Sequence, residues 1–138
     1  MLGRLIEVVA GQPLRDVLQS RILAPLGMVD TAFHVPVGQL HRLAEPFAKD
    51  PDSGADVSVL DVRLPVAMDM GGGGLVSTAA DYGRFLQMLI NGGVLDGARL
   101  ISRKTVELMT SDHLGSIPAD GDLLPSGHGF GLGFAVRM

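Results

Sequence analysis

The stretch from Gly71 to Gly93, GGGGLVSTAADYGRFLQMLINGG, decides the fold of this chain. Four consecutive glycines lead to Ser77 and Thr78, which both suit a helix N-cap, and Thr78 with Asp81 forms an acidic variant of the capping box. Apolar residues then recur at helical spacing, and Asn91-Gly92-Gly93 is typical of a helix end. The stretch therefore predicts a glycine loop followed by an amphipathic helix, whose apolar face comprises Phe85, Leu86, Met88, Leu89 and Ile90.

The glycine run itself, Gly71 to Gly74, has three interpretations. The first is an anion cradle at a helix N-terminus, but neither a G-x-G-x-x-G nor a Walker pattern is present, and no lysine follows. The second is a flexible loop without a role. The third is a wall of a substrate cleft formed with other parts of a larger protein, because glycine lets the backbone come close to a ligand. The residue pattern alone slightly favours the second interpretation.

Composition argues against several classes of function. The chain has 138 residues, 46% hydrophobic and 19% charged, which permits one domain with a packed core. The net charge is −4 and the basic residues are scattered, so nucleic-acid binding is not expected. Cysteine is absent and the four histidines lack metal-ligand spacing, so we expect no disulfide and no metal site. No apolar run approaches the roughly 20 residues of a membrane span.

Two helices are predicted near the start of the chain. The first ends at Gly11, and the second is opened by Pro13, carries Asp16 in its first turn and ends at Ala24–Gly27. The apolar residues of the first helix are Leu2, Leu5, Ile6 and Val9. Because this helix is already under way at Met1, without an N-cap, we expect the chain to be an internal piece of a longer protein.

The middle of the chain is less regular. Thr31–Val35 predicts a short strand. Leu43–Phe47 and Val57–Val62 predict a loose hairpin around the turn signal Asp50–Gly54. Farther along, Asp96-Gly97 predicts a tight turn.

Three further elements are predicted towards the C-terminus. Ser102 is expected to cap a helix, and residues 111–128 are expected to form a long loop. Gly129–Val136 alternates large apolar with small residues, which predicts a single strand buried on one face. No turn follows it, so we expect its partner strand to lie outside this chain.

Residue patterns identify no catalytic serine. The S-x-x-K pair is absent, because neither lysine has a serine three residues before it. The G-x-S-x-G pattern is absent as well, although Leu124–His128 resembles it loosely. Geometry rather than sequence order defines a Ser-His-Asp triad, so composition leaves one open. We nevertheless assign no catalytic role, Ser126 included, and expect the histidines at a solvated surface.

Five blocks carry a family resemblance: LGRLIEVVAGQPL from Leu2, ILAPLGMVDTAF from Ile22, GGGGLVSTAADYGRF from Gly71, LISRKTVELM from Leu100 and GFGLGF from Gly129. In this order they resemble elements of the serine β-lactamase-like superfamily, which includes class C β-lactamases, D-alanyl-D-alanine carboxypeptidases and family VIII carboxylesterases. The resemblance covers essentially the whole chain and is strongest to the esterase-like branch.

The resemblance implies an α+β class, namely a partial β-lactamase/transpeptidase-like fold. Residues 1–138 would be one fragment of that domain, with helices from its helical region and part of its antiparallel sheet. The three catalytic motifs of the family, S-x-x-K, Tyr-x-Asn or Tyr-Ser-x, and Lys-Thr-Gly or Trp-Gly-Gly, are missing. Tyr82 is followed by Gly83-Arg84, and Lys104-Thr105 is followed by valine.

We therefore expect a fragment of a serine hydrolase that is inactive by itself. The full-length parent would hydrolyse esters, or β-lactam or peptide amides, through an acyl-enzyme. The alternative is a non-catalytic binding or self-assembly module. Exposed apolar edges predict marginal folding or self-association in either case.

The resemblance also implies where a substrate would lie. Gly72, Gly73 and Gly74 would form the wall beside a small-molecule ester or β-lactam in the parent. Neither a metal nor an organic cofactor is implied. The compartment stays open: cytoplasmic for the esterase-like interpretation, periplasmic if the parent carries an upstream export signal. Met1–Gly11 itself does not read as a signal peptide, because Glu7 interrupts its apolar residues.

Overall fold

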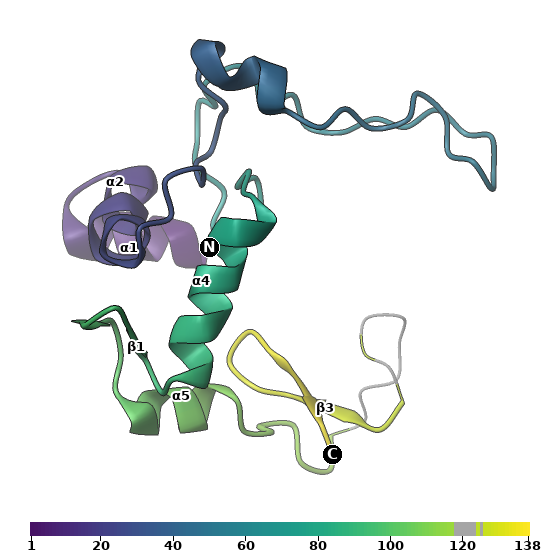
Figure 1. The fold of residues 1–138 in the computed structure, drawn as a ribbon. Helices are drawn as coiled ribbons and strands as arrows, with labels where there is room; N and C mark the ends of the chain where they lie inside the picture. The colour runs from purple at the N-terminus through teal and green to yellow at the C-terminus, as the bar shows by residue number, and fades with distance from the viewer. Residues whose placement is uncertain (118–123, 125) are drawn as a thin grey trace. The chain divides into compact units, whose positions relative to one another are not determined.

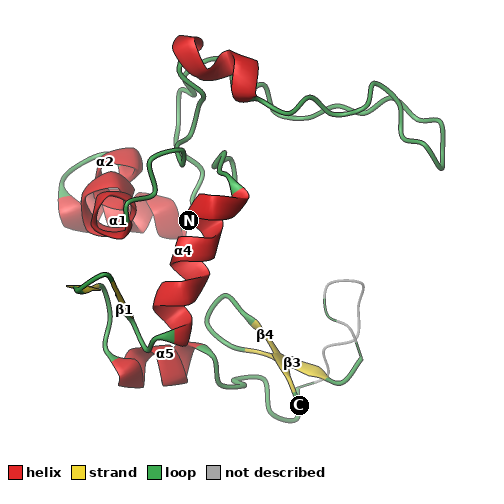
Figure 2. Ribbon diagram, in the orientation of Figure 1, coloured by secondary structure: helices red, strands yellow, loops and turns green. Residues whose placement is uncertain are grey.

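The computed structural model describes residues 1–117, 124 and 126–138, drawn in Figures 1 and 2. The chain divides into two compact units, Met1–Tyr82 and Gly83–Met138. Helices and antiparallel strands occur together, so the predicted α+β class is confirmed. The assignment of residues 1–138 to a single domain stays a prediction.

Helical backbone dominates the beginning of the first unit. Helix α1 (Leu2–Ala10) ends at Gly11, whose φ of +68° is readily adopted by glycine. Helical backbone then continues through α2 (Leu14–Leu18), a π-helical turn η1 (Gln19–Leu23) and α3 (Ala24–Leu26). Both predicted helices are confirmed. The widened turn precedes Pro25, which has no N–H to donate to the carbonyl four residues earlier.

The buried hydrophobic residues of the first unit lie mainly on the second helical stretch and just after it. They are Leu14, Val17, Leu23, Leu26, Met28 and Phe33. Helix α1 contributes little to this core, because Leu5 is 57% and Val9 is 80% exposed. The predicted apolar face of α1 therefore exists but points away from the unit's own core, and the expectation of exposed apolar surface is confirmed.

The predicted strand Thr31–Val35 is wrong. Of these residues, Ala32 alone forms a β-bridge, an isolated antiparallel one to Val76 in which the two residues exchange both backbone hydrogen bonds (3.1 and 2.8 Å). The Val35 N–H makes a single further backbone hydrogen bond, to the Val62 carbonyl at 2.8 Å. The bridge stays one residue long because Gly74, two residues before Val76, has a φ of +88°, outside the extended region.

Within the first unit, residues 43–64 run out from the other residues and back as two extended segments (Figure 1). The predicted hairpin is confirmed only next to its turn, where Lys49 bridges Asp56 and the Val57 N–H donates to Ala48. The Asp50 carboxylate holds the turn by accepting from the N–H and hydroxyl of Ser53, both at 2.7 Å. The sequence missed the 3-10 helix η2 (Val37–Arg42) that precedes this excursion.

Helix α4 (Ala79–Ile90) runs from the first unit into the second. Met88 and Leu89 are buried, whereas Ile90 is 79% and Leu86 39% exposed. The predicted apolar face is therefore wrong at Leu86 and Ile90. The buried side follows the helical repeat from Asp81 through Met88 and Leu89, and Ile90 lies about 100° beyond Leu89.

The second unit continues with a short hairpin and a helix. Strands β1 (Val94–Leu95) and β2 (Ala98–Arg99) pair antiparallel and are connected by Asp96 and Gly97. The φ angles of these two residues, 47° and 83°, confirm the predicted tight turn. Helix α5 (Arg103–Met109) begins at Ser102, whose Oγ accepts from the Thr105 N–H at 3.0 Å, so the predicted cap is also confirmed.

The predicted single strand Gly129–Val136 is wrong. Strand β3 (His128–Phe130) pairs antiparallel with β4 (Ala135–Arg137), in the register His128↔Arg137, Gly129↔Val136 and Phe130↔Ala135 (Figure 2). Two of the glycines taken for small strand residues, Gly131 and Gly133, lie in the connection, where Gly133 has a φ of +90°, whereas Gly129 pairs within β3. A Cβ at Gly131 would overlap the carbonyl oxygen of Met109. The partner of the strand is therefore within the chain.

The predicted loop 111–128 has no helix or strand at its described residues before β3; positions 118–123 and 125 lie outside the described part. Among the helices that the structure describes, none is long and apolar enough to cross a membrane.

Candidate functional site: the glycine loop and its anchors

The glycine loop, defined here as Gly71 to Gly74, is open in its middle. A Cβ built on Gly72 or Gly73 would meet no atom of the described residues within 4 Å. Gly74 is partly enclosed, since a Cβ there would lie 3.8 Å from side-chain atoms of Leu60 and Phe33. Of the three predicted substrate-wall residues, two are thus accessible from outside and the third faces the protein.

Backbone packing fixes the first residue of the loop. A Cβ on Gly71 would lie 2.7 Å from the backbone nitrogen of Gly3, which is buried in helix α1. Conversely, a Cβ on Gly3 would lie 3.0 Å from Gly71 Cα. The two backbones approach so closely because neither residue has a side chain.

An ion pair between the buried Asp69 and the partly exposed Arg15 holds the approach to the loop. The Asp69 side chain is 1% exposed, and its Oδ2 accepts from both the backbone N–H and the Nε–H of Arg15, each at 2.9 Å. Oδ1 accepts no well-aligned hydrogen bond from the described residues, yet Arg15 Nη2 lies 2.9 Å from it as counter-ion. The hydrogen bond to Asp69 raises the pKa of Arg15, which stays charged.

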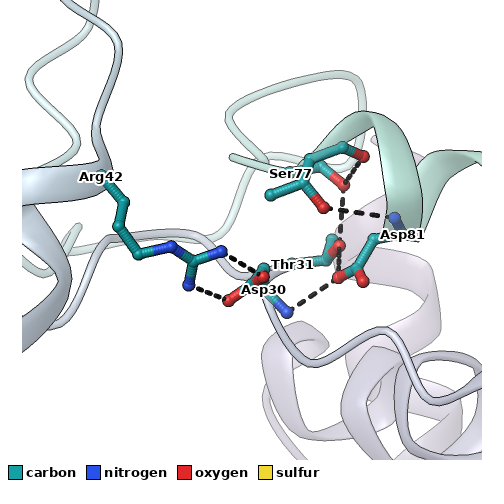
Figure 3. Close-up of polar contacts among 6 residues, drawn as sticks. Asp30, Thr31, Arg42, Ser77 and Asp81 are labelled. Carbon is teal, nitrogen blue, oxygen red and sulfur yellow. Dashed lines mark hydrogen bonds and ion pairs between the residues drawn. The ribbon is translucent and has the colours of Figure 1, made fainter.

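On the other side of the loop, the Ala32–Val76 bridge is followed by a polar cluster around the buried Asp81 and Thr31 (Figure 3). Asp81 Oδ2 accepts from the Asp30 N–H and from the Thr31 hydroxyl, both at 2.8 Å. Thr31 Oγ1 also lies 2.8 Å from Ser77 Oγ. The single Thr31 proton goes to the carboxylate, so Ser77 donates its own proton to Thr31.

The same cluster determines the start of helix α4. The Asp81 N–H donates to Thr78 Oγ1 at 3.2 Å, which is the N-cap half of the predicted capping box. A buried carboxylate therefore already occupies the first turn. Because a second negative charge there would be repelled, the anion-cradle interpretation is not supported.

An ion pair extends the cluster outward. The two terminal guanidinium nitrogens of Arg42, Nη1 and Nη2, donate to Oδ1 and Oδ2 of Asp30, each at 2.6 Å (Figure 3). The hydrogen bond from Arg42 lowers the pKa of Asp30, although desolvation opposes the shift. Beside the pair lies a half-open cavity of about 310 Å³, whose wall includes His34 and Ser77.

The described residues around the cavity do not form the arrangement of an activated nucleophile. The Ser77 proton is directed through Thr31 to a carboxylate, rather than to an imidazole or a lysine. Of the two lysines, Lys49 pairs with Asp56 and Lys104 with Glu107. The absence of a catalytic residue from this chain stays a prediction.

Other residues weighed from the sequence lie elsewhere. Lys104 and Thr105 lie in the first turn of α5, as expected, rather than on a strand. His113 Nε2 lies 2.8 Å from the Leu108 carbonyl, and Ser126 is exposed in the turn before β3. Within the described ranges, no group of three or more His, Cys, Asp or Glu side chains could hold a metal ion.

Sequence reasoning missed the anchors of the loop. Asp69 and Arg15 are 54 residues apart, and nothing in either local pattern predicts that they pair. The one available signal was Gly3, because a glycine within a predicted helix disfavours the helix and calls for a packing reason, here the contact of the first turn of α1 with Gly71.

The family model described as Beta-lactamase matches residues 1–137. Protein Rv1367c of Mycobacterium tuberculosis (strain ATCC 25618 / H37Rv) is 34% identical over 142 residues, covering 99% of this chain and 35% of that protein. Penicillin-binding protein 4 of Amycolatopsis lactamdurans is 32% identical over 142 residues, covering 96% and 35%. The chain thus spans about a third of these relatives' length.

A solved structure has the same fold. EstCE1, a hydrolase with promiscuous acyltransferase activity, superposes with a TM-score of 0.70 at 25% identity, covering 99% of this chain and 38% of that structure. The β-lactamase/transpeptidase-like assignment is therefore confirmed, and the elements described above correspond to part of that fold.

Proposed function

This chain belongs to the Beta-lactamase family, and from that premise we propose that it supplies one wall of the acyl-transfer cleft of a serine hydrolase. The observation that carries the proposal is the glycine loop. It is fastened on both sides, by Asp69 and Gly71 before the opening and by Val76 after it, while Gly72 and Gly73 face open space. A fixed backbone without side chains is suited to the close approach of a ligand.

The reaction would be acyl transfer to water. The family resemblance implies a serine, activated by a lysine and a tyrosine, that attacks an ester or amide carbonyl and forms an acyl-enzyme. Backbone N–H groups would stabilise the oxyanion. The catalytic residues would come from segments other than residues 1–138, so the chain itself would be a fragment without turnover.

Esters are the substrate class that we favour. The sequence blocks resemble the esterase-like branch most, and the similar EstCE1 structure is that of a hydrolase with acyltransferase activity. The relative called a penicillin-binding protein keeps a β-lactam or peptide amide as the competing substrate class.

Two experiments test the proposal. The purified chain is incubated with p-nitrophenyl butyrate, nitrocefin and a fluorescent penicillin, with heat-denatured chain as control. Turnover above that control, or a covalent adduct on any serine, would overturn the inactive half of the proposal. In a full-length protein that joins residues 1–138 to an S-x-x-K segment, Gly73→Tyr is expected to raise KM for bulky esters more than for acetate esters. If Gly73→Tyr left the preference between bulky and acetate esters unchanged, the glycine loop would not be a wall of the substrate cleft.

A non-catalytic assembly module is the second candidate, favoured by the exposed apolar side chains of helix α1. Such a surface is typical of a contact with another protein surface. Sedimentation velocity of the purified chain separates this candidate from the first, because a folded monomer at all concentrations would count against assembly.

A further inference from the structure

The segment that leads into the glycine loop contains a carboxylate withdrawn from solvent. Asp69 lies two residues before Gly71 and its side chain is 1% exposed, whereas the Arg15 side chain is 43% exposed. Charged side chains are seldom so deeply buried unless they are paired. The partner here is a single residue at the start of α2.

Arg15 approaches Asp69 from two directions. Its backbone N–H, one of those left without a partner at the start of a helix, donates to Oδ2. Its guanidinium reaches both carboxylate oxygens, with Nε at 2.9 Å from Oδ2 and Nη2 at 2.9 Å from Oδ1. Main chain and side chain of Arg15 therefore hold the same carboxylate, which restricts both its position and its orientation.

The glycine contact acts next to this ion pair. Gly71 packs against Gly3 with no room for a Cβ on its side of the contact, so the backbone at residues 69 to 71 is held by α1 and α2 together. The following two residues, Gly72 and Gly73, have no such neighbour among the residues that the structure describes. The geometry thus places a rigid segment immediately before an open one.

We propose that Asp69 is a positioning residue for the glycine loop. Its ion pair with Arg15 holds the loop in one conformation before a substrate arrives. A preformed wall avoids the loss of conformational entropy that ordering a mobile loop would add to substrate binding. The structural part of this inference stands on the contacts alone, and its meaning for catalysis rests on the proposed function.

A merely structural role for Asp69 would predict a different effect of its loss. General loosening of the first unit would mobilise distant segments as much as the glycine loop. A positioning role predicts a local effect, confined to the residues that follow the ion pair. The readout must therefore report on the loop and on a distant site in parallel.

The chain contains no cysteine, so single cysteines can carry a nitroxide label at chosen positions. Gly73→Cys places the label on the open part of the loop. Gly38→Cys places a matched control label on η2, where a Cβ would also meet nothing within 4 Å. Each labelled chain is compared with its Asp69→Asn version. The control substitution is Asp16→Asn, which removes an exposed carboxylate next to Arg15 on α2.

Electron paramagnetic resonance then measures label mobility. Asp69→Asn is expected to shorten the correlation time at position 73 by about twofold or more, within the nanosecond range typical of loops, and to leave position 38 unchanged. Asp16→Asn is expected to change neither. Arg15→Lys keeps the charge but loses the forked contact, so it should shift position 73 in the same direction by less.

The positioning role would be overturned if Asp69→Asn increased the mobility of both labels equally, unfolded the whole chain, or left the mobility at position 73 unchanged. Steady-state kinetics of Asp69→Asn in the full-length protein described above then test the link to catalysis, with an expected rise in KM for bulky esters of at least about threefold and a smaller change in kcat. A mobile label with unchanged KM would leave the positioning role intact and refute the proposed function of the loop.

Discussion

Asp81 Oδ2 accepts a hydrogen bond of 2.8 Å from the hydroxyl of Thr31, which lies 50 residues earlier in the chain. Both side chains are buried, with 4% of Asp81 and 6% of Thr31 exposed. The bond joins the segment that follows α3 to the first turn of α4. It thereby fixes the end of the glycine loop that is farther from Asp69.

Replacing the buried Thr31 by valine, a side chain of nearly the same size, should destabilise the chain strongly. Thr31→Val removes a donor to a buried carboxylate and the acceptor of Ser77, for an expected cost of about 1–3 kcal/mol in the free energy of unfolding. Urea unfolding measures it. Thr110→Val is the matched control, because Thr110 donates to a carbonyl at an exposed position. Equal small effects of the two substitutions would contradict the importance of the buried bond.

Adding a methyl group to Gly71 should be costly. The new Cβ would lie 2.7 Å from the backbone nitrogen of Gly3, so two backbones must move apart. We expect Gly71→Ala to lower the free energy of unfolding by about 1–3 kcal/mol. Gly72→Ala, one residue later in open space, serves as control and should change it by less than about 0.5 kcal/mol. Similar values for the two variants in urea unfolding would refute the close approach.

Stability should fall with acid through Asp112. Hydrogen bonds from the N–H groups of Leu114 and Gly115, and a further one from Phe130, lower the pKa of this carboxyl. The folded chain thus takes up the proton less readily than the unfolded chain. The contribution is complete above the ordinary value of 3.8 and is lost as the pH falls through the lowered folded pKa.

The check is the unfolding midpoint measured from about pH 6 to about pH 3, in the parent chain and in Asp112→Asn. Other hydrogen-bonded carboxylates also contribute, so the variant should lose part of the slope rather than all of it. An identical slope in the two proteins would show that Asp112 is not involved.

The exposed face of α1 should govern association without governing the fold of the first unit. Val9 is 80% exposed, so Val9→Lys should change the free energy of unfolding by no more than about 0.5 kcal/mol. It should also reduce self-association in sedimentation experiments. Val29→Lys replaces an equally exposed valine outside that helix and is the control. Equal reduction by both variants would indicate a nonspecific effect of charge.

Local chemistry made the helix ends and tight turns predictable. Gly11, Gly27 and Ser102 end or begin helices where the sequence indicates, and Asp96-Gly97 forms its turn. These features depend on the φ angles and hydrogen bonds of a few consecutive residues, which are visible in a single sequence.

The errors arose where distant residues decide the structure. Gly131 lies in the connection between β3 and β4 because it packs under the Met109 carbonyl, a contact that no local pattern encodes. For the site, the sequence indicated the glycine loop and the Thr78 cap. It did not indicate the Asp69–Arg15 ion pair, since pairing over 54 residues depends on the fold as a whole.

The contrast between Gly71 and its two successors has an evolutionary consequence. Gly72 and Gly73 do not have a left-handed backbone, and a Cβ on either would meet no described atom within 4 Å, so other residues can replace them without displacing the scaffold. The codons of these two residues can therefore change with little effect on folding, whereas the codon of Gly71 cannot. A saturation library restricted to these two codons would explore new surface chemistry at a small cost in lost clones.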